Sequence, residues 1–157
     1  MLTVNIPGRG TMTFEHIVLD FNGTMARDGV LLPGVKEKLN LLAESLNIHI
    51  LTADTFGTGK EACREIKGST HILEQGKEGG PLKKEFVKAL GKEKTIAVGN
   101  GTNDVQMLRE AALGIVVIGP EGTSAKALEA ADVVVKDICD GLDLLLNTKR
   151  LIATLRS

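Results

Sequence analysis

Two carboxylates, a hydroxyl and an ammonium group stand where each could take part in phosphate chemistry. Asp20 and Thr52 each follow a short apolar run. Lys83 follows a glycine-rich segment, and Asp104 ends the run Gly99–Asp104. Carboxylate oxygens are ligands that a hard divalent cation prefers, and ammonium and hydroxyl groups can hold phosphoryl oxygens. These residue types indicate a site for a phosphate and a divalent metal, provided that the fold brings them together.

Asp20 is expected at the carboxyl end of a buried strand. Ile17-Val18-Leu19 is an apolar, largely β-branched run, and the turn pair Asn22-Gly23 follows it. Ligands of open parallel sheets bind at that edge. An isolated Asp before Asn-Gly is more often only a turn cap, so the interpretation depends on the later segments.

The remaining apolar runs alternate with segments of helical spacing. Further strands are expected at 48–51, 70–73, 95–98, 115–118 and 133–135. Helices are expected at about 33–46, 60–66 after a Gly57-Thr58-Gly59 loop, 83–90, 104–113 and 123–130, and from 137 towards the C-terminus. This alternation predicts βαβ units, and therefore a three-layer, doubly wound α/β fold with a mainly parallel, Rossmann-like sheet. Asp20, Thr52, the 100–104 segment and the helix beginning at Lys83 would then meet at one edge of the sheet.

The first 14 residues predict a β-hairpin. Strands at 2–6 and 11–14 flank the turn Pro7-Gly8-Arg9-Gly10. The hairpin could contact another subunit, which predicts a homo-oligomer, or fold back as an edge extension of its own sheet. The length of 157 residues is that of a single domain, 1–157.

Composition excludes several classes of partner. The net charge is −1, aromatic residues make up 3%, and Trp and Tyr are absent. These values argue against nucleic acid as a partner. No apolar run approaches the roughly 20 residues of a membrane span, and no signal peptide is visible. Cys63 and Cys139 are interpreted as buried thiols in a reducing cytoplasm. His49 is interpreted as structural, and His16 and His71 as belonging to no cluster.

The chain from Ile17 to Val135 resembles the haloacid dehalogenase-like (HAD) superfamily, and in particular the phosphorylation domain of P-type ATPases. The family's first motif, an Asp followed by Gly-Thr, is matched by Asp20–Thr24. The strand-terminal Thr of the second is matched by Thr52, and the Lys of the third by Lys83. The fourth, Gly-Asp-Gly-x-Asn-Asp, is matched by Gly99–Asp104 except at Asn100. A lone motif of this kind is weak, whereas these occur in order and at suitable spacing.

The resemblance implies a fold, a cofactor and residue roles. It implies a HAD core and phosphoryl transfer through an aspartyl phosphate on Asp20, with Mg²⁺ held by Asp20, the Asn22 backbone carbonyl and Asp104. Catalytic roles fall to Asp20, Asn22, Thr52 and Lys83. Phosphate contacts are expected from Gly23, Thr24, Thr52, Ala53, Lys83 and Asn103. The implied substrate is a phosphorylated small molecule or a phosphoprotein.

Two departures from the family pattern predict slow turnover. Phosphatases of the superfamily carry a general acid and base Asp where this chain has Asn22. An amide cannot accept the proton, and loss of a general base costs roughly 10²–10⁴ in rate. Asn100 removes a negative charge near the metal and should weaken Mg²⁺ binding. The alternative is a catalytically degenerate module that binds phosphate or a partner.

Some side chains keep two interpretations. Lys84 competes with Lys83, but helix spacing favours Lys83 and leaves Lys84 in solvent. Lys77 is more simply a solvated loop charge. Asp54 could orient Thr52 or waters on the metal, or could cap the next helix. The segments 25–32 and 55–81 are too short to hold a cap domain, so the site should be open or covered by another subunit.

Overall fold

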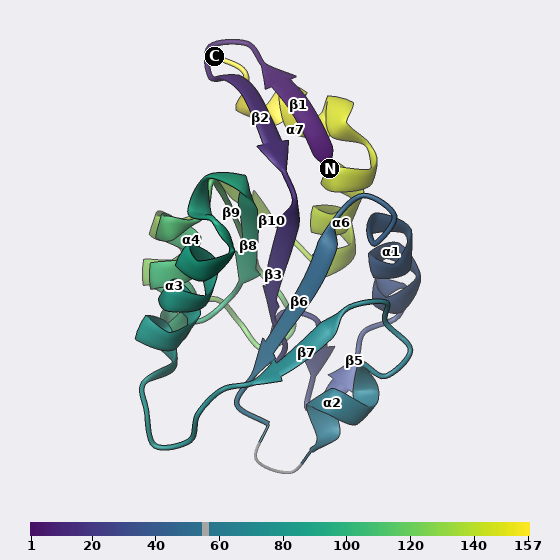
Figure 1. Cartoon of the computed structure of the whole chain (residues 1–157), viewed down its shortest axis with the longest axis vertical. Helices are drawn as coiled ribbons and strands as arrows, with labels where there is room; N and C mark the ends of the chain where they lie inside the picture. The colour runs from purple at the N-terminus through teal and green to yellow at the C-terminus, as the bar shows by residue number, and fades with distance from the viewer. Residues whose placement is uncertain (55–56) are drawn as a thin grey trace.

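A six-stranded parallel sheet forms the centre of the molecule (Figure 1). The computed structural model describes residues 1–54 and 57–157. The strand order is β10-β9-β8-β3-β6-β7, and every neighbouring pair is parallel. The strands are β3 (His16–Asp20), β6 (Asn47–Thr52), β7 (Ser69–Ile72), β8 (Thr95–Gly99), β9 (Leu113–Val117) and β10 (Val133–Val135).

Helices cover both faces of this sheet. They are α1 (Val35–Leu42), α2 (Thr58–Ala62), α3 (Gly79–Leu90), α4 (Val105–Glu110), α5 (Ala125–Ala130), α6 (Ile138–Leu146) and α7 (Thr148–Leu155), with 3₁₀ turns at Lys92–Lys94 and Thr102–Asp104. Alternate residues of β3 face opposite ways: Ile17 and Leu19 pack in the cluster that contains α1, α6 and α7, and Val18 packs in the cluster that contains α3, α4 and α5. The predicted three-layer, doubly wound fold is therefore confirmed.

Several helix boundaries differ from the prediction. Helices α1, α2 and α4 end three or four residues early, and two larger differences concern α3 and the C-terminus. The helix that carries Lys83 begins at Gly79, so Gly79-Gly80-Pro81 is its first turn and not part of a loop. Proline is tolerated there because first-turn amides have no partner within the helix. The single C-terminal helix is in fact α6 and α7, which separate at Asn147, where φ is −125° and ψ is 72°.

The segment 25–32, expected to be a loop, contains a small antiparallel pair. Strands β4 (Ala26–Arg27) and β5 (Val30–Leu31) flank Asp28 and Gly29, whose φ angles are 51° and 78°. Asp-Gly with positive φ at both positions is the signal of a tight hairpin turn, so the sequence does carry this feature. The described residues contain no larger insertion that would form a cap domain.

The N-terminal hairpin forms a separate two-stranded sheet and does not extend the main one. Strands β1 (Leu2–Ile6) and β2 (Gly10–Phe14) pair with each other. Val4, Ile6 and Phe14 are buried in the same cluster as Leu151 and Leu155 of α7. The prediction of a hairpin is confirmed, and its interpretation as an edge extension is wrong.

The three histidines of the chain lie in one row on neighbouring strands β3, β6 and β7. His16 Nδ1 is 3.1 Å from His49 Nε2, and His49 Nδ1 is 3.4 Å from His71 Nε2. Phe86 of α3 packs against His49 and His71, with ring centroids at 5.6 and 4.7 Å. The prediction that His16 and His71 belong to no cluster was wrong, because it took no account of strand register.

Two further expectations concern cysteines and membranes. Cys63 is buried as predicted, but Cys139 is only partly buried, and its thiol lies 3.4 Å from the Pro33 carbonyl oxygen. Within 1–54 and 57–157, no helix has the length and apolar character needed to cross a bilayer.

Candidate active site

The ammonium group of Lys83 joins two carboxylates at the carboxyl edge of the sheet. Its Nζ donates to Asp20 Oδ1 and to Asp104 Oδ1, at 2.7 Å each. Lys83 is 1% exposed, Asp104 0% and Asp20 8%, so this group of charges is almost removed from water. The structure thus brings together three of the residues that the sequence singled out, and it selects Lys83 over Lys84.

Asp104 is held by the turn that follows β8. Its Oδ2 accepts hydrogen bonds from the backbone amides of Asn100 and Gly101, at 2.9 and 3.0 Å. A Cβ atom at Gly99 would lie 2.5 Å from Asp104 Cγ, so only glycine fits at the end of this strand. Both oxygens of Asp104 therefore already have protein partners.

Asn100 ties the Asp20 turn to two other loops. Thr24 Oγ1 donates to Asn100 Oδ1 at 3.0 Å, and Asn100 Nδ2 donates to the Gly122 carbonyl at 3.0 Å. Gly23 has φ +77°, and a Cβ there would lie 2.5 Å from Asn100 Nδ2. Gly23 and Thr24 therefore shape the turn around Asp20.

Thr52 ends β6 beside this edge and is 2% exposed. Its Oγ1 accepts a hydrogen bond from the Asp54 amide at 3.2 Å, which leaves the hydroxyl proton available to another acceptor. The Asp54 carboxylate accepts from the Lys60 amide at 3.0 Å and from Thr58 Oγ1 at 3.4 Å. Asp54 thus both orients Thr52 through its amide and binds the start of α2 through its side chain.

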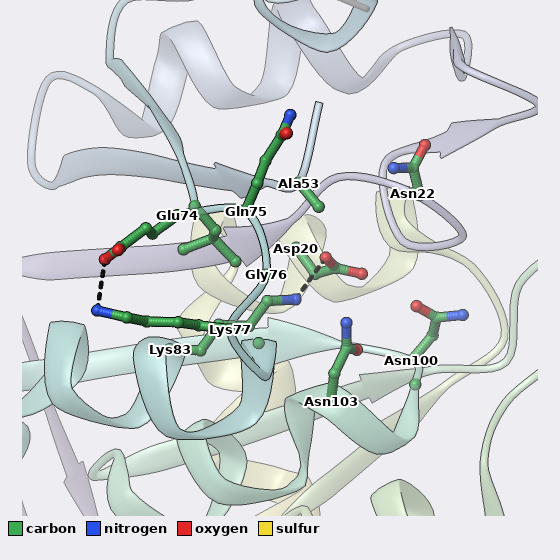
Figure 2. Close-up of a pocket in the computed structure, with 13 residues that line it drawn as sticks. Asp20, Asn22, Ala53, Glu74, Gln75, Gly76, Lys77, Lys83, Asn100 and Asn103 are labelled. Atoms are coloured by element: carbon green, nitrogen blue, oxygen red, sulfur yellow. Dashed lines mark hydrogen bonds and ion pairs between the residues drawn. The ribbon is translucent and has the colours of Figure 1, made fainter. Parts of the chain in front are cut away.

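A cavity of about 520 Å³ opens over Asp20 and Lys83 (Figure 2). Five predicted site residues line it, namely Asp20, Asn22, Ala53, Lys83 and Asn103. Gly23, Thr24, Thr52 and Asp104 are not among its lining residues. Asn100 and Gly101 also line it, as does the segment Leu73–Lys77 with Gly79.

The 73–77 segment was not predicted as part of the site. It follows the end of β7 just as the other site residues follow β3, β6 and β8. The strand-end argument could have included it, but it was applied only to the ends that match family motifs. Lys77, interpreted as a solvated loop charge, lies at this cavity and donates to Glu74 Oε2 at 2.7 Å.

The buried charges are unbalanced, with two carboxylates for one ammonium. Burial and the nearby Asp104 charge raise the pKa of Asp20 to about 7, although Lys83 opposes this. The pKa of Lys83 is also raised: burial favours its neutral form, but the two carboxylates outweigh that effect. Burial is the main cause for Asp20, and the two upward shifts share one further contribution, the excess negative charge at the site. A further cation there would relieve it.

The donor set around Asp20 suits a hard divalent cation. Asp20 offers Oδ2, whose contact with Thr24 Oγ1 is long at 3.4 Å, and Asn22 offers a backbone carbonyl. Asn100 offers an amide oxygen that accepts from Thr24 and keeps a second lone pair. Within the described residues no cluster of three or more acidic, His or Cys side chains forms a metal site. Any cation site here would therefore combine side-chain and backbone oxygens.

Comparisons with known proteins point to one superfamily. No protein-family model matches the chain. A soluble P-type ATPase-like phosphatase of Methanocaldococcus jannaschii is 32% identical over 124 residues, which cover 77% of this chain and 45% of that protein. The chain thus spans less than half of that relative. MJ0073, an uncharacterised protein of the same organism, is 47% identical over 98 residues, 62% of this chain and 90% of that protein.

Solved structures share the fold at low sequence identity. A subfamily III A HAD hydrolase from Legionella pneumophila gives a TM-score of 0.71 at 15% identity and covers 90% of this chain and 87% of its own. A second structure is the 3-deoxy-D-manno-octulosonate 8-phosphate phosphatase of Moraxella catarrhalis in complex with magnesium, phosphate and the sugar acid. Its TM-score is 0.65 at 20% sequence identity, and the match covers 91% of this chain and 94% of that chain.

Three observations indicate the class of protein: the strand order of the sheet, the Asp20–Lys83–Asp104 group, and these relatives. The chain is similar in fold and in sequence to proteins of the HAD superfamily. One sequence relative is the soluble P-type ATPase-like phosphatase, and a solved HAD hydrolase and a solved sugar-acid phosphatase share the fold.

Proposed function

We propose that the chain is a magnesium-dependent phosphohydrolase or phosphotransferase that forms an aspartyl phosphate on Asp20. The observation that carries the proposal is the buried ammonium of Lys83, 2.7 Å from the Asp20 carboxylate. A phosphoryl group above Asp20 brings negative charge to a site that already has an excess of it, and Lys83 offsets part of that charge. Phosphoryl transfer requires mostly such positioning and charge stabilisation.

The first step forms one bond and breaks another. An Asp20 carboxylate oxygen attacks phosphorus, and the bond between phosphorus and the leaving oxygen breaks. Thr52 has a hydroxyl proton available for a phosphoryl oxygen, since its Oγ1 already accepts from Asp54. The leaving oxygen takes its proton from water, because Asn22 has no acidic proton to give.

Asp20, the Asn22 carbonyl and Asn100 Oδ1 are the residues that would hold Mg²⁺. The ion would supply positive charge at the phosphoryl oxygens. The magnesium complex of the Moraxella phosphatase supports this choice of metal. Asp104 as a ligand stays a prediction, and its bonds to Lys83, Asn100 and Gly101 argue that it acts by holding Lys83.

Hydrolysis of the aspartyl phosphate is expected to be slow. In the second step, water attacks the acyl phosphate and must lose a proton. Asn22 can orient that water but cannot accept the proton. We propose a reducing cytoplasm as the setting, with a phosphorylated small molecule or phosphoprotein as substrate.

The test is covalent labelling. The protein is incubated with acetyl phosphate and Mg²⁺, and the phosphorylated residue is located by mass spectrometry. A phosphoryl adduct on Asp20 is expected, absent from Asp20→Asn and reduced when EDTA removes the metal. No adduct, together with no turnover of a panel of phosphate esters, would overturn the proposal.

The second candidate is a degenerate module that binds phosphate or a partner without chemistry. It is favoured by Asn22 and Asn100, amides at two positions where the family pattern has acids. Its signature would be saturable binding of inorganic phosphate, observed by calorimetry, without any covalent adduct.

A further inference from the structure

The cavity over Asp20 is larger than the phosphate chemistry requires. Its 520 Å³ falls within the usual range for small-molecule sites, roughly 300–1,000 Å³. Asp20 and Lys83 account for the phosphate end. Figure 2 shows Asn22, Asn100 and Asn103 grouped around Asp20, and Glu74 and Lys77 on the opposite side. The space between these walls is where the rest of a substrate would lie.

Three carboxamides without a hydrogen-bond partner among the described residues lie in the polar lining of this space. The side chains of Asn22, Gln75 and Asn103 make no hydrogen bond to any residue in 1–54 or 57–157, whereas Asn100 is tied to Thr24 and Gly122. A carboxamide both donates and accepts hydrogen bonds. A hydroxyl group also does both, so several hydroxyl groups on a ligand would match these side chains.

The charge and the residue types of the cavity lining narrow the class of ligand further. The Glu74–Lys77 ion pair, at 2.7 Å, neutralises the charge at the cavity wall, so a second anionic group on the ligand would have to break it. None of the described residues that line the cavity is aromatic, so none of them offers a ring for stacking on a nucleobase. Among the described lining residues, Leu73 and Ala53 are the apolar side chains larger than glycine.

We infer that the substrate is the phosphate monoester of a small uncharged polyol or sugar, with its hydroxyl groups bound by Asn22, Gln75 and Asn103. This inference rests on the proposed function, because it takes the phosphate to lie at Asp20 and Lys83. It selects the small molecule over the phosphoprotein.

Binding to Asp20→Asn tests the ligand class without turnover. Calorimetry would compare glucose 6-phosphate, sorbitol 6-phosphate, adenosine 5′-monophosphate, a phosphoserine peptide and inorganic phosphate, all with Mg²⁺ present. The two polyol esters are expected to bind about tenfold more tightly than the nucleotide or phosphate, since each added neutral hydrogen bond contributes only a few-fold. Equal or tighter binding of the nucleotide or the peptide would overturn the inference.

Gln75→Leu, combined with Asp20→Asn, tests whether the Gln75 side chain binds the hydroxyl groups of the ligand. We expect about fivefold weaker binding of the polyol esters and unchanged binding of inorganic phosphate. Gln106→Leu, an exposed glutamine of α4 outside the cavity, is the matched control and should change neither. Loss of polyol and phosphate binding together, or no change in either, would count against a role for Gln75.

These outcomes are separable from those of the labelling experiment. An Asp20 adduct without a preference for polyol esters overturns only the substrate class. A polyol preference without an adduct and without turnover of phosphate esters supports the ligand class and overturns the catalytic proposal.

Discussion

Lys83 is the shared partner of two carboxylates that could not otherwise be buried side by side. Each contact is 2.7 Å long, and the lysine side chain is 2% exposed. Charges buried this deeply interact far more strongly than at a surface, and removing one partner leaves an uncompensated charge.

Lys83→Met is therefore expected to destabilise the fold by about 3–5 kcal/mol. The loss of stability should be smaller at pH 6 than at pH 8. Asp20, whose pKa is raised to about 7, is mostly protonated at pH 6, and its protonation relieves the repulsion between Asp20 and Asp104. Urea unfolding at both pH values measures it. Lys84→Met, on the adjacent residue of the same helix, is the control and should change stability by less than about 0.5 kcal/mol. Similar losses in both variants would contradict the argument.

Asn22→Asp should accelerate dephosphorylation. The new carboxyl group restores a general acid and base beside Asp20, an effect of roughly 10²–10⁴ in rate. Single-turnover decay of the phosphorylated protein, prepared with acetyl phosphate, measures this step alone. An Asp variant that decays no faster than the parent would show that Asn22 does not limit hydrolysis.

Asn100→Asp should make stability depend on magnesium. An aspartate cannot donate to the Gly122 carbonyl, and it adds a charge near Asp20, so Tm in EDTA is expected to fall. Saturating Mg²⁺ should restore the Tm of the variant. The variant is expected to bind Mg²⁺ about tenfold more tightly than the parent protein does. Thermal unfolding across a Mg²⁺ titration tests both effects. A Tm that responds to Mg²⁺ no more than the parent's would exclude position 100 from the metal site.

The sequence could predict residue types at strand ends but not every role within the site. Asp20, Lys83 and Asp104 were expected together because they follow strands or begin a helix at one edge, and they are in contact. The hydrogen bonds by which Asn100 links Thr24 to the Gly122 carbonyl could not be predicted. They depend on Gly122, 22 residues away, and on the positive φ of Gly23. The metal role assigned to Asp104 came from the motif, which does not show that both of its oxygens have other partners.

At the scale of elements, the register between neighbouring strands determines which side chains lie side by side, and the order of the strands alone does not. All six strands of the main sheet were expected, because their apolar runs are continuous and bounded by turns. The histidine row required knowing that β3, β6 and β7 are neighbours and how they are offset. The two-residue strands β4 and β5 lie below the length at which alternation is visible.

The histidine row predicts pH-dependent stability. Burial, with smaller contributions from the charges of His16 and His71, lowers the pKa of His49 from 6.5 to about 4. The folded state thus holds His49 neutral, and the unfolded chain binds more protons between those values. The stability that this contributes is present above pH 6.5 and is lost as pH falls towards 4.

The expected loss between pH 7.5 and 5.0 is on the order of 1 kcal/mol, after a reduction for partial exposure of the ring. Urea unfolding at the two pH values measures it. His49→Gln should flatten the dependence by that amount, and the difference between the two proteins separates His49 from other titrating groups, Asp20 among them. An unchanged pH profile in His49→Gln would contradict the assignment.

At the scale of the whole molecule, the hairpin is part of the core. Val4, Ile6 and Phe14 are at most 2% exposed and share a cluster with α7. Arg9 lies 3.5 Å from Asp132, which adds a contact to the main body. Deleting residues 1–14 would therefore expose core surface as well as remove any subunit contact, so truncation cannot test assembly cleanly.

A homo-oligomer with a contact through the hairpin stays our prediction, and a substitution on the exposed face of the hairpin tests it. Asn5 and its cross-strand partner Thr11 are exposed on that face and polar. Such residues can contribute hydrogen bonds to a subunit contact. A second surface is available at the edge strand β7, which has one neighbour and leaves Ile72 49% exposed. Unpaired strand edges readily pair with another chain.

Light scattering over a range of concentrations should show an oligomer for the parent, most simply a dimer. Asn5→Arg should shift it towards monomer, because burying the added charge at a subunit contact is unfavourable, while leaving Tm at low concentration unchanged. Ile72→Arg serves as the matched control on the sheet edge and should leave the oligomer intact. The reverse pattern would move the contact to β7, and a parent that is monomeric at every concentration would contradict the prediction altogether.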